Sequence, residues 1–370
     1  MTRRYGAGLG EAGEGAAALR QALAEADVPA GANLALLYAN DRFAPDYPDL
    51  VARTKAETGI ETVVGTVGLG VVGAGGERFE RPALSVMAMA LPADSFFAFG
   101  PLQETAEAGF GAWMEGREMS LALVAADPRT PELPSHLADL AEESRGYCLG
   151  GLTASRNGSA ASGCRVGSGP GLSGVLFDLA TVPVSTGITQ SCLPLTEAMA
   201  VTAADGQVIK EIEGQPALNA LLDLVERDFG GDLAGAWPLL HPAFPVLGSE
   251  RGDYLVRDFV GLDPQEGWIA VGELVEPGRR ILFCRRDAEA ARTDLARMAA
   301  AAKARCSAPP KAAVYISCVA RGPQLFGGNG AEVAILRAAL GQLPITGFYA
   351  AGEIAGERLY GYTGVLALLS

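Results

Sequence analysis

The sequence predicts an α+β protein with mixed β-sheets covered by helices, built from repeated β-α-β-β units. Three observations support this prediction. Of the 370 residues, 49% are hydrophobic and 19% charged, which is typical of a chain that buries a large core. Apolar runs with strand character alternate with stretches of helical periodicity. The same order of elements also recurs three times, in segments of about 60 residues.

The first segment begins at the apolar run Leu34 to Tyr38 and ends at Leu91. Pro48 fits the first turn of a helix and Gly59 fits the position just after its end. The expected elements are a strand at 34–38, a helix at 48–57, a strand at 61–65, a glycine-rich turn at 65–76 and a strand at 83–91.

The second and third segments repeat this order. The second has an expected strand at 119–125, a helix at 134–144, a strand at 147–149, a polar loop at 155–171 and a strand at 173–179. The third has a strand at 313–319, a glycine turn at 326–330, a helix at 332–340 and strands at 345–351 and 362–369. Segments this short cannot each bury a sheet, so we expect them to pack together. Asn157 and Ser159 of the polar loop either reach over a pocket or belong to mobile surface.

Two further stretches lie outside these segments. Gly6, Gly8 and Gly10 precede an amphipathic helix, but no strand is expected before that helix, so a dinucleotide-binding turn is not supported. The region from 181 to 303 is expected to hold short strands, a hairpin with its turn at Asp205-Gly206, and two helices. We expect the strands within 181–212 and 254–286 to complete the sheets of the repeated segments.

Composition and charge exclude several classes of function. The formal charge of −14 and the sequence pI of about 4.7 argue against a nucleic-acid partner. The apolar runs are far shorter than the ~20 residues of a membrane span, and the N-terminus lacks an apolar signal segment, which predicts a cytoplasmic protein. The six cysteines contain no CxxC pair, so we expect reduced thiols and no zinc site. With two histidines and no GxSxG motif, a nucleophilic triad is not supported.

A series of short motifs, weak one by one, is specific in its order and spacing. The chain resembles the FIST proteins (F-box and intracellular signal transduction) from about Asn33 to Leu369. The stretches that carry the resemblance are Val63-Val64-Gly65, Gly73-x-Gly75-Gly76-Glu77, Gly150-Gly151-Leu152, Cys192-x-Pro194, Val201-Thr202, Gly214-x-Pro216-Ala217-Leu218, Leu255-Val256-Arg257-Asp258, Gly261-x-Asp263, Arg286-Asp287-Ala288, Cys318-x-x-Arg321-Gly322, Glu332, Gly347-Phe348-Tyr349 and Gly352-Glu353-Ile354.

The resemblance implies an organisation and a function. It places a FIST N-terminal region at 30–214 and a FIST C-terminal region at 215–369. It implies a sensory protein of bacterial signal transduction that is not an enzyme, binds a small polar ligand such as an amino acid, and signals through a partner such as a histidine kinase or a cyclase. Many relatives carry Cys-Ser after the first signature glycine. Thr66-Val67 stands there in this chain, so its specificity would differ.

The polar residues at the strand ends of the third segment are the candidate ligand site. Arg321 could hold a carboxylate through two parallel hydrogen bonds, and Glu353 an ammonium group; a structural ion pair between them is the alternative. We expect both to line one pocket with Cys318. Its opposite wall would be Cys192 or the turn from Gly65 through Gly68 to Gly70, where glycines let a ligand approach the backbone or merely permit a tight turn.

Two other functions remain open from the sequence. Some FIST proteins are reported to bind haem and sense nitric oxide, and His241 would be the better axial ligand here, although a half-buried loop histidine is the plainer interpretation. A cysteine-dependent enzyme would use Cys318 or Cys192, but a free cysteine is more often a small buried hydrophobic residue. The leading prediction therefore has no cofactor, with haem as the alternative.

Overall fold

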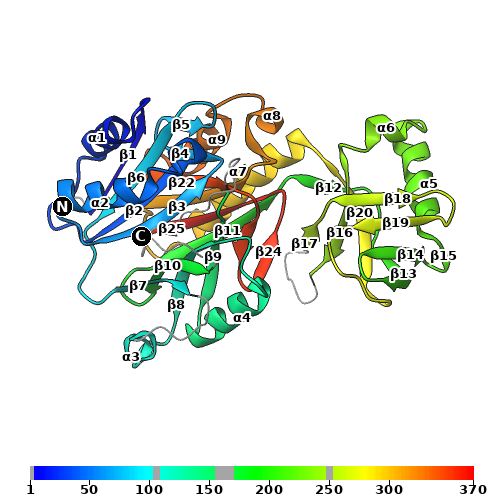
Figure 1. Cartoon of the computed structure of the whole chain (residues 1–370), viewed down its shortest axis with the longest axis horizontal. Coiled ribbons are helices and arrows are strands. Elements are labelled where there is room, and N and C mark those ends of the chain that lie inside the picture. Colours follow the sequence, from blue (N-terminus) through cyan, green and yellow to red (C-terminus); the bar gives the residue numbers. More distant parts are fainter. Residues whose placement is uncertain (1–3, 103–108, 155–170, 247–252) are drawn as a thin grey trace. The chain divides into compact units, whose positions relative to one another are not determined.

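The chain forms two compact units, seen in the computed structural model in Figure 1. The structure describes residues 4–102, 109–154, 171–246 and 253–370; Asn157 and Ser159 lie outside the described residues. Unit 1 comprises residues 1–190 and 292–370, and unit 2 comprises residues 191–291. Unit 2 is thus an insertion into unit 1.

Unit 1 confirms the predicted repeat and extends it. In each of three copies, a first strand pairs in parallel with a second strand and antiparallel with a last strand. The last strand also pairs antiparallel with a leading strand that comes before the first strand in the chain. Each copy therefore has the sheet order leading–last–first–second, with one helix before and one or more after its first strand.

The elements of the three copies are as follows. The first copy comprises β1 (Tyr5–Glu11), α1 (Gly15–Ala26), β2 (Leu34–Asn40), the 3-10 helix η1 (Asp41–Phe43), α2 (Tyr47–Thr58), β3 (Thr62–Gly68), β4 (Gly70–Gly73), β5 (Gly76–Arg78) and β6 (Ala83–Met89). The second comprises β7 (Phe96–Leu102), α3 (Phe110–Met114), β8 (Ser120–Ala126), α4 (Leu133–Glu143), β9 (Tyr147–Leu152) and β10 (Leu172–Asp178). The third comprises β11 (Val184–Gln190), α7 (Ala288–Ala304), β21 (Ala312–Cys318), α8 (Gly322–Phe326), α9 (Ala331–Leu340), β22 (Ile345–Ala350), β23 (Glu353–Ala355), β24 (Arg358–Tyr360) and β25 (Thr363–Leu369).

Two hairpins tie the copies together. The β4–β5 hairpin leaves the first copy and pairs with β22, at the edge of the third copy's sheet. The β23–β24 hairpin leaves the third copy and pairs with β9, at the edge of the second copy's sheet. The expected glycine turn at 65–76 is therefore wrong for most of its length, because residues 65–68 belong to β3 and Gly70–Gly73 to β4; a turn lies only at Ala74-Gly75, inside the β4–β5 hairpin.

One glycine occupies the same place in all three copies. Gly65, Gly150 and Gly347 each lie on the second strand, opposite a residue of the first strand. A Cβ atom at these positions would lie 1.8, 1.8 and 1.7 Å from a main-chain carbonyl oxygen of the neighbouring strand. Gly65 and Gly347 also have φ values of 149° and 157°, which other residues rarely adopt. The fold itself requires glycine here.

The glycines near the N-terminus have a structural role that the sequence interpretation missed. Gly6, Gly8 and Gly10 lie within strand β1, so the expectation that no strand precedes the helix was wrong. Cβ atoms on them would lie about 2 Å from the carbonyl oxygens of three α1 residues. Those residues are Ala26, Ala22 and Ala18. Two strand residues span about 6.7 Å and four helix residues 6 Å, so glycines two apart match alanines four apart. The three glycines therefore allow the backbone of β1 to pack directly against the backbone of α1.

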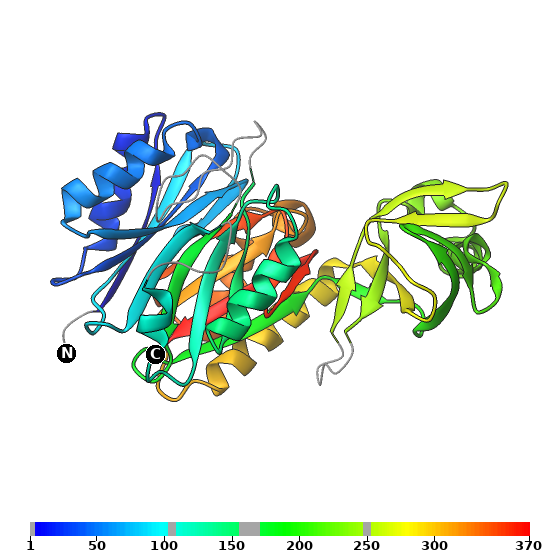
Figure 2. The same cartoon turned by 60° about the horizontal axis from the view of Figure 1, so that its bottom comes forward.

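Both faces of the first copy's sheet are buried. Residues of one face, such as Leu37 and Val86, pack with α1 and α2 in one core cluster; Figure 2 shows these two helices together on one face of the sheet. On the other face the Tyr38 ring stacks on Phe348 of the third copy, with 5.1 Å between ring centroids. This explains why the strands are apolar throughout instead of alternating.

Unit 2 is a separate sheet with its own core. The expectation that strands 181–212 and 254–286 complete the repeated sheets holds only for β11; the others pair with one another. The hairpin at Asp205-Gly206 is confirmed, with Gly206 at φ 60°. The elements of unit 2 are β12 (Cys192–Pro194), β13 (Met199–Asp205), β14 (Val208–Ile212), β15 (Gln215–Pro216), α5 (Ala217–Phe229), α6 (Leu233–Ala236), β16 (Leu240–Pro245), β17 (Tyr254–Val256), β18 (Phe259–Asp263), β19 (Trp268–Val271) and β20 (Arg280–Arg286).

Candidate functional site

Arg321 is fully buried at the end of the loop between β21 and α8. Its Nε and one terminal nitrogen each lie 3.4 Å from Glu332 Oε2, and the other terminal nitrogen donates to the Thr189 carbonyl oxygen at 3.5 Å. The guanidinium also lies over the Phe326 ring, 5.1 Å from its centroid. Each of the three guanidinium nitrogens of Arg321 therefore already has a protein oxygen as its hydrogen-bond partner.

Glu332, in the first turn of α9, is the centre of this buried network. Its carboxylate accepts hydrogen bonds from Tyr315 at 2.5 Å, from Tyr349 at 2.9 Å and from Ser317 at 3.0 Å. Tyr315 and Ser317 are two apart in β21 and so face the same side, toward α9. Burial raises the pKa values of both tyrosines, which keeps them as donors. The signal in the sequence was polar residues at a period of two within an apolar strand.

Glu353 and Cys318 form a second buried contact. Glu353 Oε2 accepts from the Thr363 hydroxyl at 2.6 Å and from the Thr363 N–H at 3.2 Å, while Oε1 is buried with no hydrogen-bond partner within normal bonding distance. Burial raises the pKa of Glu353 to about 8, although Thr363, the Arg321 charge and the Cys318 thiol lower it. Burial also raises the pKa of Cys318, so this thiol is not a thiolate at neutral pH.

The structure thus brings Cys318, Arg321 and Glu353 into one neighbourhood, in which each interacts electrostatically with the other two. Arg321 is ion-paired with Glu332 and not with Glu353. That these three residues bind a ligand stays a prediction.

A third buried carboxyl group connects two copies. Glu77 of the β4–β5 hairpin is 2% exposed, and its Oε1 accepts the Val333 N–H of α9 at 2.8 Å. The residue before α9 is Gly330, which has no side chain to cap the helix, so Glu77 supplies the cap from another copy. Burial raises the pKa of Glu77, and the nearby Glu332 charge raises it further.

The remaining predicted residues belong to other elements of the fold. Gly65 and Gly68 are in β3; a Cβ on Gly68 would lie 2.7 Å from the Tyr349 carbonyl oxygen, so this glycine packs against β22. Cys192 and His241 belong to unit 2. His241 is buried in strand β16 with Nδ1 3.5 Å from Asp258, not in a loop. Among the residues that the structure describes, no group of three or more His, Cys, Asp or Glu side chains could hold a metal.

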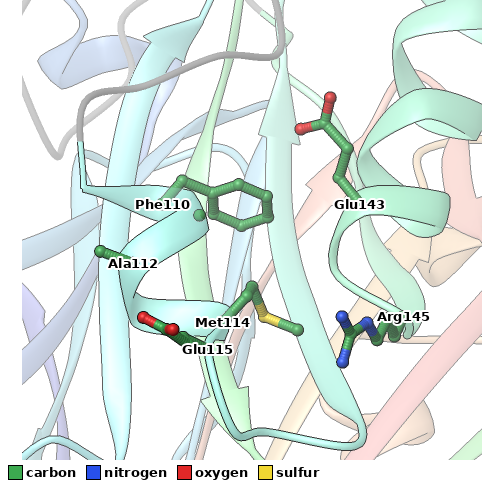
Figure 3. Close-up of a pocket in the computed structure, with 7 residues that line it drawn as sticks. Phe110, Ala112, Met114, Glu115, Glu143 and Arg145 are labelled. Carbon is green, nitrogen blue, oxygen red and sulfur yellow. The ribbon is translucent and has the colours of Figure 1, made fainter.

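A pocket of about 540 Å³ lies in the second copy, between α3 and the end of α4 (Figure 3). Phe110 and Met114, both buried, form its apolar floor. Glu143 and Arg145 come from the opposite side, at the end of α4. The other residues that line it are Gly111, Ala112 and Glu115.

Local structure positions the pocket's guanidinium. Helix α4 ends at Glu143, and Arg145 follows with φ 47°, the left-handed conformation that commonly terminates helices. One Arg145 terminal nitrogen donates to the Arg117 carbonyl oxygen at 3.1 Å. Among the residues that the structure describes, this is the one hydrogen bond of the exposed Arg145 side chain, and it leaves other N–H groups to meet a ligand. Neither Glu143 nor Arg145 was selected from the sequence, because charged residues near a helix end are common on protein surfaces.

Comparisons with known proteins agree with the architecture. A model described as the FIST N domain matches residues 33–215, and one described as the FIST C domain matches residues 217–356. Uncharacterized protein Rv0628c of Mycobacterium tuberculosis is 32% identical over 381 aligned positions, covering 96% of this chain and 95% of the relative. Uncharacterized protein Mb0898c of Mycobacterium bovis is 34% identical over 195 positions, about half of each chain. The chain therefore belongs to the FIST family, whose domains are sensory domains of signal transduction.

Proposed function

We propose that this protein is a cytoplasmic sensor that binds a small zwitterion, such as a free amino acid, in the pocket between α3 and α4. The observation that carries the proposal is the combination of an apolar floor with a guanidinium and a carboxylate on one side. Its volume of about 540 Å³ lies within the range of small-molecule sites. The structure contains no helix, among its described residues, that is long and apolar enough to cross a membrane.

Each part of the pocket matches one part of such a ligand. Arg145 would receive the ligand carboxylate through charge-assisted hydrogen bonds. Glu143 would pair with the ammonium group, and Phe110 and Met114 would contact an apolar side chain of the ligand. The zwitterion's two charges are then both met by opposite charges, which is the condition for holding it away from water at low cost.

The α3–α4 pocket is a different site from the strand ends of the third copy, where Arg321 and Glu353 lie. Arg321 already donates to Glu332, so a ligand carboxylate would have to displace a buried ion pair, which costs several kcal/mol. Arg145 has no carboxylate partner among the described ion pairs and is exposed. The α3–α4 pocket therefore requires less rearrangement to admit a zwitterion than the Arg321 network does.

The packing of α3 provides a route by which ligand binding would change the rest of the second copy. Phe110 and Met114 belong to one core cluster with residues of β8 and α4. A ligand that draws α3 toward the end of α4 would be sensed by the second copy's sheet, and a signalling partner such as a histidine kinase or a cyclase would recognise that state.

The proposal is tested by a thermal-shift panel of the natural amino acids at low ionic strength, together with a visible absorption spectrum. We expect one group of related amino acids to raise the melting temperature in a saturable way, since a ligand that binds only the native state stabilises it. No shift with any of them would contradict the proposal. A Soret band in the purified protein would instead favour the haem-sensor alternative.

A further inference from the structure

Two thiols of unit 2 lie side by side on its first and last strands. Cys192 is on β12 and Cys284 on β20, and these strands pair so that Cys192 is opposite Arg286 and Cys284 is opposite Pro194. Residues two apart in a strand share a face, so the cysteines are diagonal neighbours on the same face of the sheet. Their side chains are close enough to share a hydrogen bond.

The same strands are the ones that enter and leave unit 2. Unit 2 begins at Ser191, directly before Cys192, and ends at Ala291, seven residues after Cys284. The Ser191 carbonyl oxygen accepts the Asp287 N–H at 3.0 Å, which continues the pairing of the two strands. Both covalent connections between unit 2 and unit 1 run through these two segments, and hydrogen bonds hold the segments together.

We propose that Cys192 and Cys284 are a redox-sensitive dithiol pair, whose oxidation to a disulfide staples the entering and leaving strands of unit 2. A peroxide oxidises it in two steps. The Cys192 thiolate attacks one peroxide oxygen, forming a sulfenic acid and releasing water. The Cys284 sulfur then attacks the Cys192 sulfur, forms the S–S bond and, with loss of its proton, expels the sulfenic oxygen as a second water. A thiol reductant reverses the reaction by thiol–disulfide exchange.

The surroundings assign the two roles. Cys284 is fully buried, and its thiol hydrogen-bonds the His241 carbonyl oxygen at 3.4 Å. The hydrogen bond with Cys192, and then burial, raise the pKa of Cys284, which suits the residue that reacts second. Cys192 is 4% exposed and belongs to a strand of only three residues, followed by the exposed Leu193. So short a strand can open locally and admit a small oxidant.

The geometry of the two strands comes close to what a disulfide requires. A disulfide needs Cα atoms about 4.4–6.8 Å apart. Diagonal neighbours on paired strands lie about 7–8 Å apart, so β12 has to shift along β20 by about 2 Å before the bond can form. The Tyr254 hydroxyl donates to the Cys192 carbonyl oxygen at 2.5 Å and ties β12 to β17 in the reduced state. Cys148 and Cys318, by contrast, lie in separate sheets of unit 1.

The experiment uses the full chain, reduced and then exposed to hydrogen peroxide or to a glutathione redox buffer. Non-reducing peptide mapping should find the peptides of Cys192 and Cys284 joined, with dithiothreitol restoring both thiols. Hydrogen exchange at 191–195 should be about tenfold slower in the oxidised protein, because the staple blocks local opening. Cys192→Ser should abolish the cross-link and the slowing, whereas Cys306→Ser, at a half-exposed cysteine, should change neither.

Two results would overturn the proposal. One is oxidation at Cys306 or Cys164 while the peptides of Cys192 and Cys284 stay free. The other is a cross-link that forms only under denaturing conditions. Cys284→Ser provides a second variant, so that a folding defect in Cys192→Ser would not obscure the outcome.

Discussion

Glu353→Gln should remove a large pH dependence of the stability of the β23–β24 hairpin and its surroundings. Glu353 is fully buried, and burial raises its pKa from 4.5 to about 8. A carboxyl group whose pKa is higher in the folded state stabilises that state fully below the unfolded pKa. The contribution is lost as the pH rises through the folded pKa, because the unfolded chain gives up its proton first.

The size of this pH-dependent loss of stability follows from how far the pKa of Glu353 is raised. Between pH 4.5 and pH 8 or above, the raised pKa corresponds to a loss of about 5 kcal/mol, of which about 3 kcal/mol is lost by pH 7. Glutamine resembles the protonated carboxyl group and keeps an acceptor for Thr363. The variant should match the wild type near pH 4.5 and exceed its stability increasingly from pH 6 to pH 9.

Native-state hydrogen exchange measured from pH 5 to pH 9 reports this directly, because it resolves the amides of β23 and Thr363 from those of unit 2. Glu357→Gln is the matched control, since Glu357 is exposed in the turn of the same hairpin. The reasoning is refuted if wild type and Glu353→Gln lose protection in parallel as the pH rises, or if the control flattens the profile equally.

Three other substitutions test the packing of unit 1. Gly65→Ala should lower stability by several kcal/mol or prevent folding, because its Cβ would lie 1.8 Å from a carbonyl oxygen. Gly13→Ala, with open space around it, should leave the melting temperature unchanged. Equal melting temperatures for the two variants would contradict this reasoning. Glu77→Ala should lower stability by about 1 kcal/mol through loss of the α9 cap, and Glu77→Gln should retain most of it; urea titrations that find the two alike would rule out capping. Arg321→Ala should lower stability by about 3–5 kcal/mol, because it leaves the Glu332 carboxylate buried without its countercharge; an unchanged urea midpoint would show that the ion pair is not structural.

Much of the architecture could be predicted from the sequence. The β-α-β-β order was visible because buried strands are apolar runs and because helix boundaries carry Pro and Gly, as at Pro48 and Gly59. Two features could not be seen. Hairpins such as β4–β5 pair with another copy, which local pattern does not encode. The β1 strand contains three glycines, which lower strand propensity but are required for contact with α1.

The site was harder to predict than the fold. Arg321 and Glu353 stood out because they are ionisable residues at the ends of apolar strands, but their roles depend on the groups that they contact, which are Glu332 for Arg321 and Thr363 for Glu353. Glu332 is the second residue of a helix, where an acidic residue is common, and only the fold shows that it accepts hydrogen bonds from Tyr315 and Tyr349. Exposed residues that surround a pocket are even harder to identify from the sequence, because they form a binding site only when the fold brings them close to one another.

Isothermal titration calorimetry on three proteins tests the central claim, that the α3–α4 pocket holds a zwitterion. The amino acid with the largest thermal shift is titrated into the wild type, Arg145→Gln and Arg53→Gln, the last an exposed arginine of α2 outside the pocket. We predict that Arg145→Gln weakens binding about 10- to 100-fold, as expected for losing a hydrogen-bonded charge, and that Arg53→Gln leaves it unchanged. Equal affinity for Arg145→Gln and the wild type would contradict the account and place the ligand elsewhere in the protein.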